Sequence, residues 1–139
     1  MRNVDNTCVQ ITSDKNIKFE ENRRKIVFTN RDARSYKKVQ VDGCAIVQGE
    51  RCDNLLTSAD ENEERFVELK GTDVLHAIHQ LERTIQMIGE YEDNRHAYVI
   101  CTNVAPAYTT QIQKKKILFK QKYKSELVLK EKQHTVALY

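Results

Sequence analysis

Residues 51–71 read RCDNLLTSADENEERFVELKG, and this stretch decides the fold. It contains two strand-like runs, residues 51–56 and 66–70, and Gly71 ends the second. The run between them, residues 57–65, is acidic and rich in small residues, which predicts a solvated loop. We expect the two strands to pair as an antiparallel hairpin.

A long amphipathic helix is predicted directly after this hairpin. Thr72 or Asp73 can cap its N-terminus. Apolar residues then recur every three or four positions, which is the spacing of one buried helix face. These residues are Val74, Ile78, Leu81, Ile85 and Ile88.

The sequence after this helix predicts another strand and another helix. Residues 97–102 are continuously apolar, which is typical of a buried parallel strand. Residues 109–123 predict a second helix with Ile112, Ile117 and Phe119 as its apolar positions. Residues 127–129 and 135–138 are expected to form a final hairpin.

Residues before the central hairpin predict further strands. Apolar and polar residues alternate at 9–11 and 17–19, residues 25–29 are rich in β-branched and aromatic side chains, and residues 38–41 alternate again. Asp42-Gly43 indicates a tight turn, with residues 44–47 as the returning strand. The expected fold class is therefore mixed α/β (α+β), with a central mixed β-sheet flanked by helices. With four glycines and one proline the chain has no linker-like segment, so residues 1–139 are expected to form one domain.

Four cysteines, Cys8, Cys44, Cys52 and Cys101, show neither a CxxC pair nor a zinc-binding spacing. The first residues do not resemble a secretory signal, so a cytoplasmic location and reduced, mostly buried thiols are expected. No run of apolar residues is long enough for a membrane span.

Glu68 and Lys70 are two residues apart on a predicted strand, so their side chains leave the same face. Val67 and Leu69 point the other way and are expected to pack under a helix. Asp53, on the neighbouring strand, can reach the same place. Two converging carboxylates repel each other unless a cation joins them, and Mg²⁺ favours such oxygen ligands. The alternative is a solvated strand face on which Glu68 and Lys70 form a weak ion pair.

This pattern resembles the PD-(D/E)XK nuclease superfamily, whose fold is that of type II restriction endonucleases. The resemblance covers about residues 38–105, and Cys52 stands where the family name has proline. It implies that Asp53 and Glu68 hold Mg²⁺ or Mn²⁺ and that Lys70 positions or activates the attacking water. It also implies that Gln80 aligns the site from the following helix. Family members commonly add an N-terminal glutamate, for which the available residues are Glu20 and Glu21.

Charge is distributed unevenly along the chain. The net charge is +3, but residues 101–139 hold eight Lys and two Glu, so they carry +6 and residues 1–100 carry 3 − 6 = −3. A basic segment can contact the phosphate backbone of DNA. The candidate residues for such contacts are Lys114, Lys115, Lys116, Lys120, Lys122 and Lys124. His76 and His79 share one side of the first predicted helix, where exposed histidines are commoner than metal ligands.

Two functions are expected from these observations. The first is a metal-dependent nuclease, acting on DNA as an endonuclease, with a homodimer suggested by analogy with enzymes that cut two strands. The alternative is a catalytically silent module with the nuclease fold that binds nucleic acid or a protein within a larger defence or repair complex. No residue pattern supports a third idea, a phage or mobile-element protein that acts on a host enzyme.

Overall fold

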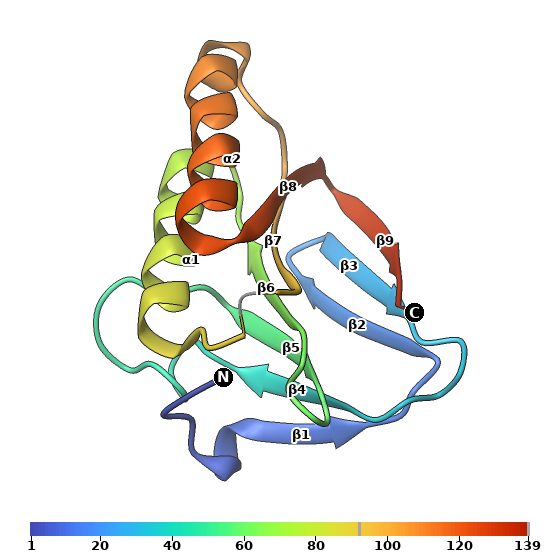
Figure 1. Cartoon of the computed structure of the whole chain (residues 1–139). Coiled ribbons are helices and arrows are strands. Elements are labelled where there is room, and N and C mark those ends of the chain that lie inside the picture. The colour runs from blue at the N-terminus through green and yellow to red at the C-terminus, as the bar shows by residue number, and fades with distance from the viewer. Residues whose placement is uncertain (92, 139) are drawn as a thin grey trace.

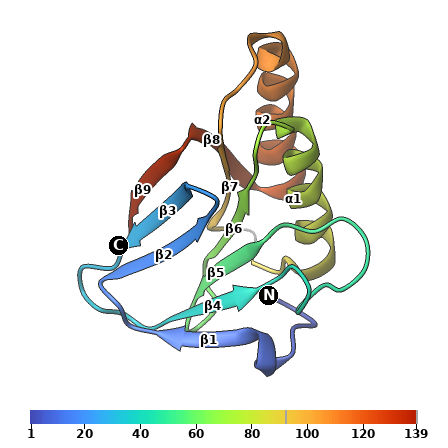
Figure 2. The same ribbon diagram turned by 180° about the vertical axis from the view of Figure 1, so that it is seen from behind.

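The structure is a computed structural model that describes residues 1–91 and 93–138. Two helices lie side by side on one face of a large sheet, and a small sheet lies on its other face (Figures 1 and 2). The helices are α1 (Val74–Ile88) and α2 (Thr109–Tyr123), with short 3-10 turns at Asn6–Cys8 and Pro106–Tyr108. The strands are β1 (Val9–Thr12), β2 (Asn16–Glu21), β3 (Arg24–Thr29), β4 (Tyr36–Gln40), β5 (Asn54–Ser58), β6 (Glu64–Leu69), β7 (Arg95–Cys101), β8 (Ser125–Glu131) and β9 (Gln133–Ala137).

The large sheet has the order β1-β4-β5-β6-β7-β8, and the small sheet has the order β2-β3-β9. β5 and β6 pair antiparallel, whereas β6, β7 and β8 run parallel and are joined through the two helices. The predicted hairpin, the buried parallel strand and the mixed α+β fold class are therefore confirmed. Helices flank only one face of the large sheet, because the small sheet covers the other.

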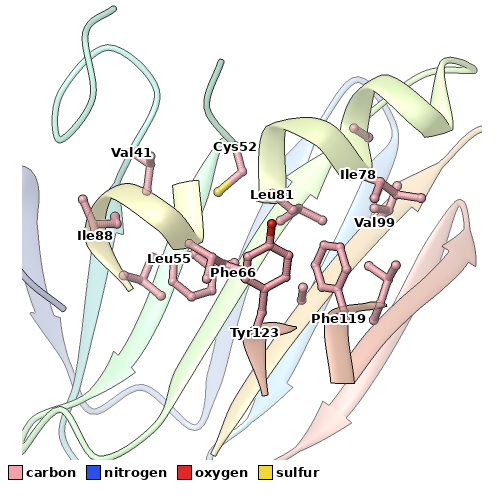
Figure 3. Packing of buried hydrophobic residues seen from close by; sticks show 14 of the residues in the cluster. Val41, Cys52, Leu55, Phe66, Ile78, Leu81, Ile88, Val99, Phe119 and Tyr123 are labelled. Carbon is pink, nitrogen blue, oxygen red and sulfur yellow. The ribbon is translucent and has the colours of Figure 1, made fainter. Parts of the chain in front are cut away.

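Each face of the large sheet has its own hydrophobic core. Leu55 and Phe66 pack with Ile78 and Leu81 of α1 and with Phe119 of α2, as Figure 3 shows. On the opposite face, side chains of the large sheet pack against β2, β3 and the C-terminal segment; this second core contains Ile17, Phe19, Ile26, Phe28, Tyr36, Leu56, Val67, Leu69, Tyr98, Ile100 and Leu138. The expectation that Val67 and Leu69 pack under a helix was wrong, because the small sheet occupies that face.

α1 follows the sequence pattern closely. Asp73 caps it by accepting a hydrogen bond from the His76 backbone N–H at 3.1 Å, and it ends before Gly89. All five apolar positions of the predicted stripe are buried. Within α2 the prediction was less accurate, because Ile117 is 57% exposed whereas Ile112 and Phe119 are buried.

The acidic segment 57–65 is not the solvated loop that its composition predicts. β5 continues to Ser58 and β6 begins at Glu64, so only residues 59–63 connect them. Glu63, Glu64 and Arg65 are buried. Their burial is tolerated because each charged side chain has an oppositely charged partner nearby, such as Arg95 for Glu64 at 3.0 Å.

Residues 44–47 do not form the predicted returning strand. The Asp42-Gly43 turn is present, with Gly43 at φ +76°, but β4 already pairs with β1 on one side and β5 on the other. No edge of β4 is left for another strand. Cys44 instead forms a disulfide with Cys8, with their Cα atoms 5.6 Å apart. This corrects the expectation of four reduced cysteines, although Cys52 and Cys101 are free and buried.

The C-terminal strands exist but do not form a hairpin with each other. β8 joins the large sheet beside β7, and β9 joins the small sheet parallel to β3. The chain therefore crosses from one sheet to the other at Lys132. Neither α1 nor α2 meets the length and apolarity that a membrane-crossing helix needs, which holds for the described residues.

Candidate metal and active site

The predicted acidic residues meet where β5 begins and β6 ends. Asp53 directly precedes β5, and its Oδ2 accepts a hydrogen bond of 2.8 Å from the Leu69 backbone N–H. Glu68 is the residue before Leu69 in β6. The antiparallel pairing of β5 with β6 thus brings the two predicted carboxylates together from positions fifteen residues apart in the sequence.

Glu68 is a buried carboxyl group with few partners. Its side chain lies on the same face of β6 as Phe66, which is the face that α1 covers. The residue is 2% exposed, and its Oε1 atom is buried without a hydrogen-bond partner. Burial, and then the charge of Asp53, raise the pKa of Glu68 to about 8. The group is therefore largely protonated at neutral pH unless a cation joins it.

Asp53 shows the same effect to a smaller extent. Burial raises its pKa to about 6, although the hydrogen bond from Leu69 opposes this rise. A third carboxylate contributes as well, because the charge of Glu21 raises the pKa of both Asp53 and Glu68. Glu21 ends β2, so the small sheet brings it to the candidate site.

Lys70 follows β6 at the same edge of the sheet. Its backbone N–H donates to the Ile100 carbonyl at 2.9 Å, which holds it beside the end of β7. The positive charge of Lys70 lowers the pKa of both Asp53 and Glu68, so it lies within electrostatic reach of both carboxyl groups. The side chain is half-buried. The structure therefore brings Asp53, Glu68 and Lys70 together as the sequence predicts.

Gln80 is placed by a different contact. Its Nε2 donates to the Arg51 carbonyl at 2.9 Å, two residues before Asp53, and its Oε1 is buried without a donor. Gln80 and Arg51 also line a hollow of about 340 Å³ that includes His76 and Glu50. His76 Nε2 lies 3.4 Å from a Glu50 carboxylate oxygen, whereas His79 is exposed on α1.

The lysines at the C-terminal end of α2 lie away from the carboxyl groups. Lys124 directly precedes Ser125, which pairs with Arg95, and Arg95 in turn pairs with Glu64 at the start of β6. Lys70 lies six residues further along that strand direction, so about 20 Å separates the two ends at a rise of about 3.3 Å per residue. The α2 lysines nearest this far end are Lys120, Lys122 and Lys124.

Several α2 lysines are also engaged with other groups. Lys115 forms an ion pair with Glu82 at 2.6 Å, and Lys120 pairs with Glu126 at 3.3 Å. Lys122 lies over the Tyr123 ring. Lys114 is exposed, and Lys116 helps to line a hollow with Ile117 and Leu127.

The residues present fit a hard divalent cation. Glu68 Oε1 and Gln80 Oε1 are buried acceptor atoms without donors, and a cation would satisfy such oxygens. Mg²⁺ is commonly bound by only one or two carboxylates, with waters and substrate oxygens completing its shell. Within residues 1–91 and 93–138, no three His, Cys, Asp or Glu side chains are grouped closely enough to hold a metal by themselves. The residues present therefore fit a divalent cation held by two carboxylates, those of Asp53 and Glu68.

Sequence reasoning named Glu21 only as one of two available residues. The alternation of Ile17 and Phe19 puts Glu21, and not Glu20, on the face of β2 that packs against the large sheet, and this was the available signal. Local sequence gave no signal for the buried pair of Glu64 and Arg95. No family model, curated protein or solved structure matches the chain.

Proposed function

We propose that the protein is a metal-dependent nuclease of the PD-(D/E)XK type, which hydrolyses phosphodiester bonds in DNA as an endonuclease. The observation that carries this proposal is the pairing of two buried carboxyl groups, Asp53 and Glu68, beside Lys70. Both carboxyl pKa values are raised, to about 6 and about 8, which is costly for a merely structural site.

Each residue has a role that follows from its chemistry. Asp53 and Glu68 would hold Mg²⁺ or Mn²⁺, with Glu21 nearby to add negative charge. The ion, when bound, would supply Lewis-acid stabilisation of charge on the phosphate and a more acidic bound water. Glu68 would release its proton as the ion binds. Gln80 would orient the site through its free Oε1.

Lys70 is the proposed residue for the water and the phosphate. An ammonium group beside two carboxylates can donate hydrogen bonds to an attacking water and keep it in line with the phosphorus atom. It can also stabilise the negative charge that develops on the phosphate oxygens during attack. Its backbone directly follows β6 and is held there by the hydrogen bond to the Ile100 carbonyl.

Cleavage is tested with purified protein at low salt and Mg²⁺ or Mn²⁺. The substrates are supercoiled, linear, branched and single-stranded DNA, with EDTA as the metal-free control. We expect cutting only with metal, and we expect Lys70→Ala to abolish it while the circular dichroism spectrum and melting temperature stay unchanged. Lys15→Ala, an exposed lysine between β1 and β2, is the matched control. If wild-type protein leaves every substrate intact, the nuclease proposal is wrong.

The second candidate is a catalytically silent module with this fold that binds nucleic acid or a protein partner. The specific observation in its favour is that only two carboxylates fit as ligands, with no third His, Cys, Asp or Glu grouped with them among the described residues. Thermal melting with Mn²⁺ distinguishes the two candidates, since a ligand that binds the folded state raises its stability. No shift at millimolar Mn²⁺ would favour the silent module.

The proposal also includes a homodimer and a cytoplasmic location. Two copies would offer one site to each strand of a duplex. Light scattering coupled to size-exclusion chromatography measures the mass in solution directly.

The Cys8–Cys44 disulfide bears on the proposed cytoplasmic location, because disulfides are rare in reducing compartments. Alkylation and mass spectrometry of protein from cell extracts would show whether the two thiols are free.

A further inference from the structure

Two turns of the chain carry basic side chains to one corner of the molecule. Arg23 lies in the turn between β2 and β3, Arg24 is the first residue of β3, and Lys132 is the single residue between β8 and β9. The Lys25 backbone N–H donates to the Lys132 carbonyl at 2.9 Å, so the two turns are in direct contact. With Lys130 of β8, we call Arg23, Arg24 and Lys132 the basic corner.

The basic corner lies at the same edge of the sheet as the candidate site. The Lys132 backbone N–H donates to the Cys101 carbonyl at 2.8 Å, at the end of β7. Arg24 Nη1 donates to Thr102 Oγ1 at 3.4 Å, and the Thr102 backbone N–H donates to the Gly71 carbonyl at 2.7 Å. Gly71 directly follows the proposed catalytic lysine. In Figure 1 both turns lie beside the end of β7.

Backbone geometry shows how charge can be removed from this corner without strain. Arg23 and Lys132 have φ values of +67° and +66°, in the left-handed region that glycine or asparagine occupies most readily. For other residues this conformation costs about 1 kcal/mol each. Both side chains are exposed, so replacing them with glycine removes charge and little packing. The turn Asn22-Arg23 has positive φ at both positions, where Asn-Gly would fit best.

Two acidic side chains at this corner, Glu21 and Glu131, offset only part of the charge of its four basic residues. Glu131 lies between Lys130 and Lys132, and its Oε1 accepts a hydrogen bond from the Val104 backbone N–H at 3.2 Å. Glu21 contributes to the electrostatics of Asp53 and Glu68. Four exposed or half-exposed cations therefore face solvent next to the site.

We propose that the basic corner, rather than Lys120, Lys122 and Lys124 at the C-terminal end of α2, binds the phosphates of the DNA strand that flank the bond at the candidate site. This inference rests on the proposed function, because it takes DNA as the substrate. A nuclease must hold phosphates next to the one it cleaves, and the corner is adjacent to Lys70. The C-terminal end of α2, beside Ser125, lies about 20 Å away along the strand direction. Contacts of this kind supply affinity and orientation rather than choice of sequence.

The test measures DNA binding without cleavage. A fluorescent duplex of random sequence is titrated with protein in EDTA, and the affinity is followed by anisotropy over a range of salt concentrations. The variant Arg23→Gly with Lys132→Gly removes two charges at positions where glycine fits the backbone better, so the fold is preserved. The matched control, Lys122→Ala with Lys124→Gly, removes two charges at the end of α2, where Lys124 has φ +54°.

We expect the corner variant to bind at least about tenfold more weakly, and the slope of log affinity against log salt to shrink by about 1.8. The control should stay within about twofold of wild type. The inference is overturned if the control loses as much affinity as the corner variant, or if wild-type protein does not bind DNA in EDTA. Binding that depends on the corner without any cleavage in Mg²⁺ or Mn²⁺ would support this inference while contradicting the proposed nuclease activity.

Discussion

Glu64 and Glu68 lie on the same face of the same strand, and both are buried, with 0% and 2% exposure. Their surroundings differ completely. Glu64 accepts hydrogen bonds from Arg95 at 3.0 and 3.1 Å and from the backbone N–H groups of Glu90 and Tyr91. Glu68 has one oxygen buried without any donor, and its pKa is raised to about 8.

This is the difference expected between a carboxylate that serves the fold and one that binds a ligand, as proposed for Glu68. A buried carboxylate that serves the fold is surrounded by donors that keep it ionised. A carboxyl group kept for binding is left partly unsatisfied, since its missing partner is the ligand. Four experiments test whether this distinction holds for the two residues, starting with the largest expected effect.

Glu64→Gln should lower the free energy of unfolding by about 3–5 kcal/mol, because Arg95 would stay buried without its counter-charge. Glu68→Gln, the same chemical change on the same strand, should not lower it. Denaturant unfolding followed by circular dichroism measures both. Equal losses in the two variants would mean that both glutamates serve the fold.

The second experiment follows stability against pH in EDTA. Because the pKa of Glu68 rises from 4.5 to about 8 on folding, the folded state binds a proton more tightly. The stability that this tighter proton binding gives the folded state is fully present below about pH 4.5 and is lost as the pH rises to about 8. Glu68→Gln should therefore be more stable than wild type near pH 8, by on the order of 2–4 kcal/mol, and similar near pH 4.5. A constant difference at all pH values would contradict the raised pKa.

Addition of Mn²⁺ is the third experiment. At a concentration of about 100 times its dissociation constant, the metal should stabilise wild-type protein by about 2.7 kcal/mol. Glu68→Gln should abolish this gain, and acidic pH should reduce it because protons compete for the carboxylates. Glu126→Gln, an exposed glutamate on β8, is the control that should keep the full gain. If Glu68→Gln gains as much as wild type, the metal binds elsewhere.

The smallest effect is expected for Gln80→Leu. This change removes the hydrogen bond to the Arg51 carbonyl and should lower the free energy of unfolding by about 1 kcal/mol. It should also weaken Mn²⁺ binding several-fold, measured by titration calorimetry. Gln86→Leu on the same helix removes one bond to Tyr123 and is the matched control, with a similar loss of stability and unchanged Mn²⁺ affinity. Unchanged metal affinity in both variants would place Gln80 outside the site.

The sequence predicted those parts of the molecule whose signals are local. The stripe of α1, its Asp73 cap and the β5–β6 pair follow from periodicity and turn residues within about twenty positions. The two-residue spacing of Glu68 and Lys70 predicts that they share one face of a strand. The β5–β6 pairing then places Asp53 beside them. Each of these patterns is decided by neighbours along the chain.

Features that depend on distant partners could not be predicted from local composition. Glu64 reads as part of a solvated acidic loop, because its partner Arg95 is 31 residues away. The disulfide of Cys8 with Cys44 depends on the pairing of β1 with β4, and β9 reads as the partner of β8 because they are adjacent in sequence. Val67 faces the small sheet rather than a helix, because alternation shows which residues share a face but not what covers it.

The pairing of β9 with β3 has a consequence for the order of folding. The Thr29 hydroxyl donates a hydrogen bond to the Val136 carbonyl, and these two residues are 107 positions apart in the sequence. The helices and the β5–β6 hairpin instead form between near neighbours in the sequence. Contacts of such long range form late, because the chain entropy lost in closing the loop is offset only once the contacts themselves have formed. The turn that holds Glu21, Arg23 and Arg24 is locked in place by this last strand. A refolding molecule should therefore complete its helical core first and assemble the charged edge of the sheet as one of the final steps.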